Sequence, residues 1–130
     1  MGFYDKKIIL AAALLTLAVT IGLTIYAMTT ETDITMKGGL LFAGGAIFIG
    51  LTIIGLFFES RFFATIIAAF GTFLFSMYLI YDVQLIIGTK AEKFSLDDYI
   101  IAALMIYIDV INIFIQLLEL ISLIFGDNQN

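Results

Sequence analysis

Long apolar runs, each separated from the next by a short polar stretch, dominate this sequence. The first two contain no charged residue, and the last two continue past a single aspartate; they cover residues 8–30, 38–58, 62–89 and 99–118. A helix that crosses the bilayer core needs ~20 residues at a rise of ~1.5 Å each. We therefore predict one domain over residues 1–130 that contains four transmembrane helices, with bounds near 7–30, 38–58, 61–89 and 97–125.

The polar stretches between these runs are short, covering residues 31–37, 59–61 and 90–98. Short connections force neighbouring helices to run in opposite directions. The first run follows two lysines, but it is longer than the ~7–15 residue core of a signal peptide and ends at no small-residue cleavage site, so we expect it to be retained. The predicted fold class is an all-α membrane protein, a bundle of four antiparallel transmembrane helices.

Each predicted helix carries one stripe of small or polar residues at helical spacing. Helices in lipid associate through small residues, which allow close backbone approach, and through side-chain hydrogen bonds. We therefore expect the stripes to face the bundle interior. They are Ala13, Thr16, Thr20, Thr24 and Ala27; Gly39, Ala43, Ala46 and Gly50; Ala64, Ala68, Gly71, Tyr78 and Asp82; and Ala102, Asp109, Asn112, Gln116 and Glu119.

The composition agrees with a membrane protein and excludes several functions. With 62% hydrophobic and 13% charged residues, the chain has too little polar material to cover a soluble fold, so its expected partner is the lipid bilayer. Six basic residues that form no patch argue against a nucleic-acid partner. Without His or Cys, only oxygen ligands remain, which suit hard cations such as calcium. No nucleophile–base pair or nucleotide fingerprint is present, so we expect neither an enzyme nor a bound cofactor.

Two aspartates, Asp82 and Asp109, interrupt the third and fourth apolar runs. An ionisable group in the bilayer core costs at least ~2.5–3.5 kcal/mol and usually marks an ion or proton route. Asp82 lies ~9 Å before Gly88, and Asp109 lies ~15 Å after Tyr99, at ~1.5 Å per residue. Because both depths are counted from the same end of an antiparallel pair, the two carboxyl groups should lie at similar height.

Two carboxyl groups in a low-dielectric site cannot both ionise cheaply, so we expect this pair to share one proton and to change charge with pH or with a cation. Such a change can bias a two-state helix arrangement. Two carboxylates are too few for a tight calcium site, which takes ~6–8 oxygen ligands, so calcium held by Asp82 and Asp109 would be weakly bound. The alternative is that each aspartate only hydrogen-bonds a Tyr, Asn or Thr on a neighbouring helix.

Three polar residues, Asn112, Gln116 and Glu119, continue the helix face of Asp109. They are candidates for the lining of a polar path through the bundle. For Glu119 an equally good interpretation is a solvated side chain at the far membrane interface.

Several segments, in this order and spacing, resemble the Bax inhibitor-1 family in its lifeguard-like branch, which carries the transmembrane Bax-inhibitor motif. They are residues 3–5, 30–35, 38–42, 81–88 (Tyr-Asp-Val-Gln-Leu-Ile-Ile-Gly) and 98–114. The resemblance implies a seven-helix protein of the endoplasmic reticulum or another endomembrane, associated with calcium leak and with suppression of cell death. It also implies that Asp82 and Asp109 are the proton-sharing pair that senses pH and gates the pore.

The chain departs from the family pattern in ways that bear on function. It corresponds to the last four helices, without the second-helix arginine that contacts the aspartate pair in some members. Val83 stands where Thr is common, and Met105 stands where Asn is common. From the resemblance we expect a pH-sensitive calcium leak channel-like protein that modulates cell death. The alternative is a non-conducting truncated paralogue that acts as an interaction subunit of full-length relatives. Either would associate with itself or with a full-length family member.

Overall fold

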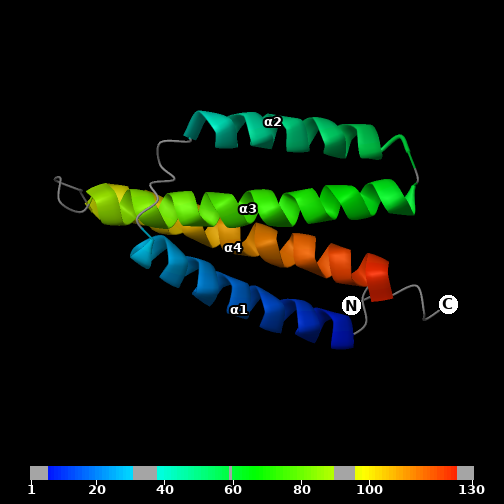
Figure 1. The fold of residues 1–130 in the computed structure, drawn as a ribbon, viewed down its shortest axis with the longest axis horizontal. Helices are drawn as coiled ribbons and strands as arrows, with labels where there is room; N and C mark the ends of the chain where they lie inside the picture. Colours follow the sequence, from blue (N-terminus) through cyan, green and yellow to red (C-terminus); the bar gives the residue numbers. More distant parts are fainter. Residues whose placement is uncertain (1–5, 31–37, 59, 90–95, 126–130) are drawn as a thin grey trace.

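The computed structural model describes residues 6–30, 38–58, 60–89 and 96–125, and within them every regular element is an α-helix. The helices are α1 (Lys6–Thr29), α2 (Gly38–Gly55), α3 (Arg61–Thr89) and α4 (Leu96–Phe125). Each is long and apolar enough to cross a membrane. Consecutive helices run in opposite directions (Figure 1). The predicted all-α, four-span membrane fold is confirmed.

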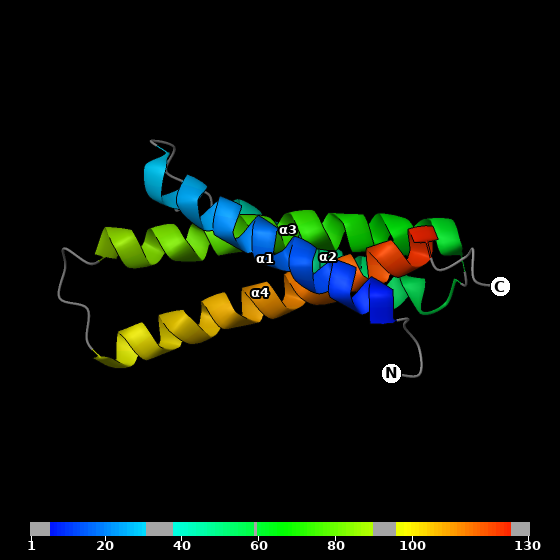
Figure 2. The same cartoon turned by 90° about the horizontal axis from the view of Figure 1, so that it is seen from below.

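Helix α3 is the centre of the bundle. It contacts each of the other three helices, whereas α2 packs mainly on α3. Figure 1 shows α2 on one side of α3, with α1 and α4 on the other. Figure 2 shows α1 crossing over α3 and α4, and it contacts both of them. The central helix therefore has two different packing faces, one toward α4 and α1 and one toward α2.

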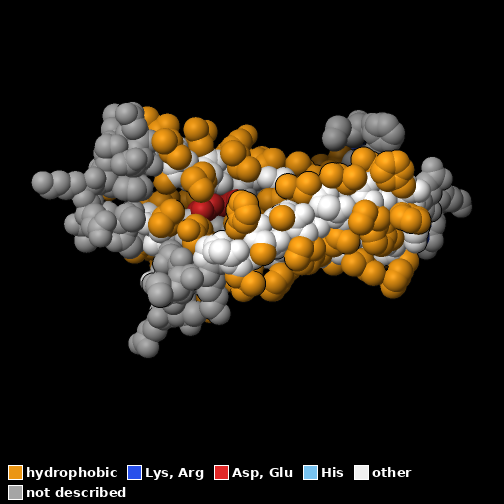
Figure 3. All heavy atoms as spheres, turned by 90° about the horizontal axis from the view of Figure 1, so that it is seen from above, with side chains coloured by type: hydrophobic (Ala, Val, Ile, Leu, Met, Phe, Trp, Pro, Cys, Tyr) orange, Lys and Arg blue, Asp and Glu red, His pale blue; other side chains and the backbone are white. Residues whose placement is uncertain are grey.

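The main buried core lies where these helices meet. It includes two side chains with no exposed surface, Leu79 of α3 and Ile113 of α4. A smaller buried cluster joins α1 to the C-terminal half of α4 and consists of Ile8, Ala12 and Leu118. Most of the other large apolar side chains point outward, as lipid contact requires. Figure 3 shows one such face, where hydrophobic side chains lie on both sides of a band of exposed backbone and other side chains.

The predicted inward stripe is right for α3 and α4 and wrong for α2. Ala68, Gly71, Asp82, Ala102, Asp109 and Gln116 are all buried, whereas Gly39, Ala43 and Ala46 are exposed. The face of α2 that meets α3 instead carries Gly38, Leu41, Gly45, Phe48 and Gly55, at spacings of three, four, three and seven residues. The side chains of α3 determine which face of α2 is packed, because the tyrosines and other large side chains of α3 fit against these glycines.

Smaller differences occur in α1 and at the end of α2. Ala12 is fully buried where Ala13 was predicted, and it accepts a hydrogen bond of 2.6 Å from the Thr16 hydroxyl. Helix α2 ends at Gly55 instead of the predicted residue 58. The reason is a tightened last turn, in which the Phe57 amide donates to Ile54 O at 3.0 Å, an i to i−3 bond.

Candidate functional site

Asp82 of α3 and Asp109 of α4 lie together at the interface of their helices. They are 5% and 6% exposed, and both side chains line one cavity between the two helices. A hydrogen bond between two carboxyl groups requires a proton on one of them, because an ionised carboxylate can only accept. Antiparallel helices bring the two positions to one height, which makes these two acids the candidates for a shared proton.

One oxygen of this pair has no partner among the described residues. Asp109 Oδ2 is buried and accepts no hydrogen bond. Beside it is a cavity of about 280 Å³ between α3 and α4, lined by Phe75, Tyr78, Tyr81, Asp82, Met105, Ile108 and Asp109. Figure 3 shows acidic atoms within an otherwise apolar face, with no Lys or Arg visible in that view. Because this oxygen has almost no accessible surface, water or a cation would reach it only after the side chains around it moved.

The polar side chains nearest the pair direct their hydrogen bonds to the backbone. Tyr78 Oη donates its single proton to Leu41 O of α2 at 2.6 Å, and Asn112 Nδ2 donates to Ile108 O within α4 at 2.9 Å. The hydroxyl proton of Tyr78 and one amide proton of Asn112 are therefore directed to backbone carbonyls and not to the aspartates.

Helix α2 holds the two cavity tyrosines through glycines. A Cβ added to Gly45 would lie 2.5 Å from Tyr78 Oη, and one added to Gly38 would lie 3.1 Å from Tyr81 Oη. Only hydrogen at these positions lets the phenol groups approach the α2 backbone. Neither glycine was predicted from the sequence to be part of the site.

The other side of the pair is tied to α1. Gln84, two residues after Asp82, donates from Nε2 to Ala27 O at 3.3 Å. Asp82 therefore lies between a contact to α2 through Tyr78 and a contact to α1 through Gln84. Movement of α3 at the aspartate pair would have to change both of these contacts.

The three candidate path residues do not join the aspartate pair as one group. Asn112 is half-buried and bonds to its own helix, as described above. Gln116 is buried, Glu119 is half-buried, and both line a second cavity of about 260 Å³ between α2, α3 and α4. Glu119 is ten residues beyond Asp109, or ~15 Å along the helix axis. It faces a cavity between helices rather than only the solvent.

No group of three His, Cys, Asp or Glu side chains that could hold a metal ion occurs among the residues that the structure describes. The aspartate pair offers oxygen ligands of the kind calcium prefers, but only from two side chains. Calcium needs ~6–8 oxygen ligands, so an ion at this pair would keep most of its water. That donor set suits transient contact with a passing cation and does not suit a permanently bound one.

Comparison with known proteins gives the family. The family model described as inhibitor of apoptosis-promoting Bax1 matches residues 1–129, nearly the whole chain. The chain belongs to the Bax inhibitor-1 family. The resemblance found in the sequence segments is thereby confirmed.

Individual relatives agree with this assignment. The chain is 36% identical over 120 residues to protein lifeguard 4 of Mus musculus, and 32% identical over 120 residues to a Golgi anti-apoptotic protein of vaccinia virus (strain Lister). Both matches cover 92% of this chain and 49% of the relative. Bax inhibitor 1 of Schizosaccharomyces pombe is 30% identical over 129 residues, covering 98% of this chain and 47% of that protein. The chain thus spans about half the length of the curated relatives it matches.

Proposed function

We propose that this chain is a pH-sensitive calcium leak channel-like membrane protein of the Bax-inhibitor type, and that it modulates cell death. The observation that carries the proposal is that Asp82 and Asp109 are both buried and both line one cavity between α3 and α4. The family match and a relative named a Golgi anti-apoptotic protein support the link to cell death and to an endomembrane.

The proposed mechanism follows from the charge of the pair. While one proton is shared, the carboxyl groups attract each other and hold α3 against α4. When that proton leaves, two like charges face each other in a poorly solvated site, where repulsion is strong. Separation of the helices, or entry of a cation next to Asp109 Oδ2, relieves the repulsion. The packing of α3 on α4 is therefore the two-state element that pH and calcium would bias.

Calcium flux into liposomes that carry the purified 130-residue chain, measured across a pH series, tests this mechanism. Asp82→Asn and Asp109→Asn replace an acid by an amide that resembles its protonated form. We expect both variants to lose the pH response and to keep, at every pH, the flux that wild type shows at the acidic end. Ser76→Ala is the matched control on α3, since its hydroxyl bonds only to Thr72 O of its own helix, at 2.7 Å. It should retain the wild-type pH profile.

The outcomes separate the two functional candidates. Flux that responds to pH identically in wild type and in Asp109→Asn would contradict the role of the pair. Absence of flux from folded wild-type protein at every pH would favour the alternative, a non-conducting subunit that interacts with full-length relatives. In that case co-purification with a full-length family member is the next measurement.

A further inference from the structure

A second cavity, of about 260 Å³, lies toward the end of α3 opposite the aspartate pair. It is formed by the end of α2 and the residues just after it, by the first turns of α3 and by the C-terminal half of α4. Pockets for drug-sized ligands have volumes of ~300–1,000 Å³, so a cavity just below that range suits a small molecule or one small chemical group.

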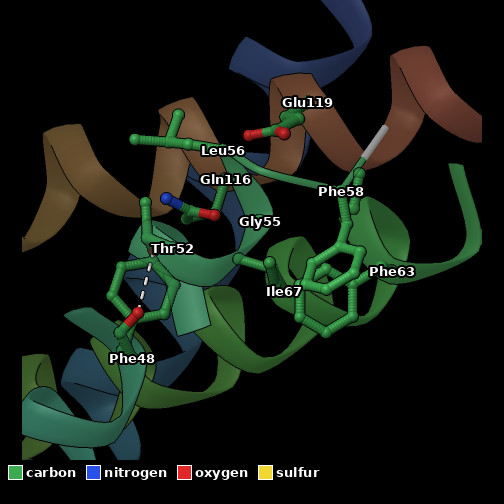
Figure 4. Close-up of a pocket in the computed structure, with 10 residues that line it drawn as sticks. Phe48, Thr52, Gly55, Leu56, Phe58, Phe63, Ile67, Gln116 and Glu119 are labelled. Carbon is green, nitrogen blue, oxygen red and sulfur yellow. Dashed lines mark hydrogen bonds between the residues drawn. The ribbon is translucent and has the colours of Figure 1, made fainter. Parts of the chain in front are cut away.

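Aromatic rings form much of the wall of this cavity. Figure 4 shows Phe48 on one side of it, and Phe58 and Phe63 together on the other. Phe58 and Phe63 are in edge contact, with ring centroids 6.3 Å apart and planes at 69°. Leu56 and Ile67 add aliphatic surface. The face of a phenyl ring carries partial negative charge, so walls of this kind attract a cation that gives up its water easily.

One acidic side chain, Glu119 of α4, enters these apolar surroundings. It is half-buried, and Figure 4 shows it together with Leu56 and Thr52 around the cavity. None of the residues that line the cavity is Lys or Arg. Arg61 lies near this end of the bundle, but its guanidinium donates to Leu123 O, and the residue is not part of the lining. When Glu119 is ionised, the cavity lining is therefore negatively charged, and its complement is a cationic ligand.

Few other polar atoms are available to that ligand. The Thr52 hydroxyl donates its proton to Phe48 O at 2.9 Å, which leaves its oxygen as an acceptor. Gln116 also borders the cavity, but its Oε1 atom has almost no accessible surface and lies against Gly71, where an added Cβ would be 2.8 Å away. The acceptors that a ligand meets are thus the carboxylate of Glu119 and one hydroxyl oxygen.

This small set of acceptors decides which cations fit. A hard dication such as calcium needs ~6–8 oxygen ligands, which two side chains and apolar walls do not provide. A primary ammonium group is strongly hydrated, and phenyl and aliphatic walls do not replace its water. An alkylated ammonium ion has little water to lose. Its methyl groups pack against apolar side chains, while its charge interacts with a carboxylate and with ring faces.

We propose that Glu119 and the three phenylalanines, Phe48, Phe58 and Phe63, form a binding site for an alkylated ammonium group such as the trimethylammonium group of choline. Aromatic pockets are the usual means by which proteins recognise quaternary ammonium ligands. Two sources carry this group, a free quaternary ammonium compound and the headgroup of a choline phospholipid. The site shares no residue with the aspartate pair and requires no conduction, so it does not rest on the proposed function.

Nuclear Overhauser effects between ligand and ring protons test the site directly. The purified chain is kept in maltoside micelles, which contain no ammonium group, and titrated with choline chloride against sodium chloride at equal ionic strength. We expect saturable contacts from the choline methyl protons to the rings of Phe48, Phe58 and Phe63. Neohexyl alcohol, the neutral carbon analogue of choline, should bind about tenfold more weakly, because it lacks the charge that the carboxylate and the rings attract.

Two variants and a control identify the groups responsible. Glu119→Gln keeps the shape of the side chain and should weaken choline binding about tenfold, without changing the binding of neohexyl alcohol. Phe63→Leu keeps an apolar wall and should weaken choline binding about two- to fivefold. Phe57→Leu is the matched control, since Phe57 precedes Phe58 but is exposed and outside the cavity lining. It should bind choline as wild type does.

Nanodiscs distinguish the two sources of the ammonium group. Discs of phosphatidylglycerol are prepared with either phosphatidylcholine or phosphatidylethanolamine, whose headgroup has the same charges but a primary ammonium. A lipid ligand predicts contacts from the phosphatidylcholine methyl protons to Phe58 and Phe63, which Glu119→Gln removes; a free ligand predicts contacts only when choline is added. Absence of contacts from both sources in folded wild type, equal binding of choline and neohexyl alcohol, or unchanged choline binding in Glu119→Gln would overturn the proposal.

Discussion

The two packing faces of α3 are built on opposite principles. Toward α4 the helix presents a buried acid, Asp82, against another acid, Asp109. Toward α2 it presents tyrosines and other large side chains that fit against glycines, as Tyr78 does against Gly45. The α2 face gains stability from close fit and from a hydrogen bond to the backbone. The α4 face contains ionisable groups and an unpaired oxygen, which contribute little to stability but can respond to pH and to cations.

This difference has a general reason. In lipid, burial of apolar surface does not drive helices together, so close packing and hydrogen bonds must do so. A glycine that accepts a large side chain provides such packing. A buried acid pair provides less, because its desolvation offsets its mutual attraction. The α2 and α4 faces should therefore respond in opposite directions when apolar groups are introduced.

The largest effect is expected on the α2 face. Gly45→Ala places a Cβ 2.5 Å from Tyr78 Oη, which must move and lose its bond to Leu41 O. Overpacking costs about 1–3 kcal/mol, and we expect the free energy of unfolding to fall by about 2–3 kcal/mol. Unfolding in mixed micelles with increasing SDS, followed by circular dichroism, measures it. Gly50→Ala, where the added Cβ meets nothing, should change stability by less than about 1 kcal/mol. Equal losses in the two variants would contradict the glycine-packing argument.

The opposite response is expected on the α4 face. Replacing a buried polar pair by apolar residues of similar volume is often neutral or stabilising by about 1–4 kcal/mol. The double variant Asp82→Val/Asp109→Val should therefore unfold with a free energy about 1–2 kcal/mol higher than wild type, in the same micelle assay. Either single variant leaves one carboxyl group buried without its partner and should be less stable than the double variant. A double variant less stable than both single variants would show that the acid pair stabilises the fold.

The number and approximate limits of the helices could be predicted because charged residues in a membrane protein are concentrated between its spans. The predicted inward faces of α3 and α4 were also right, since each carries polar residues that lipid would not accept. Helix α2 offered no such marker. Its lipid face and its protein face are both apolar and rich in small residues, so Gly39 and Gly45 cannot be distinguished without the side chains of α3.

The site followed the same rule. The proximity of Asp82 and Asp109 could be predicted from the sequence, because depth along an antiparallel pair of helices depends only on residue counts and helix rise. Gln116 and Glu119 were recognised as candidates by their position on the Asp109 face. Their cavity could not be predicted, because most of its walls come from α2, the residues just after it, and α3. Contacts among three helices depend on relative rotation, which the periodicity of one helix does not determine.

The smallest expected effect gives the most specific test of the α2 face. Tyr78→Phe removes only the hydrogen bond to Leu41 O, and such bonds between membrane helices are worth about 0.6 kcal/mol on average. We therefore expect a loss near that value. In this background Gly45→Ala should become almost harmless, because the new Cβ would then meet the ring Cζ at 3.7 Å, an ordinary contact.

The double variant Gly45→Ala/Tyr78→Phe should accordingly be about as stable as Tyr78→Phe alone and about 1.5–2 kcal/mol more stable than Gly45→Ala, a coupling of the size seen between residues in direct contact. The same micelle unfolding series measures all four proteins. Additive losses would mean that Gly45 is required by something other than the Tyr78 hydroxyl. In that case the close approach of the two helices, and not this side chain, would be the source of the stability of the α2 face.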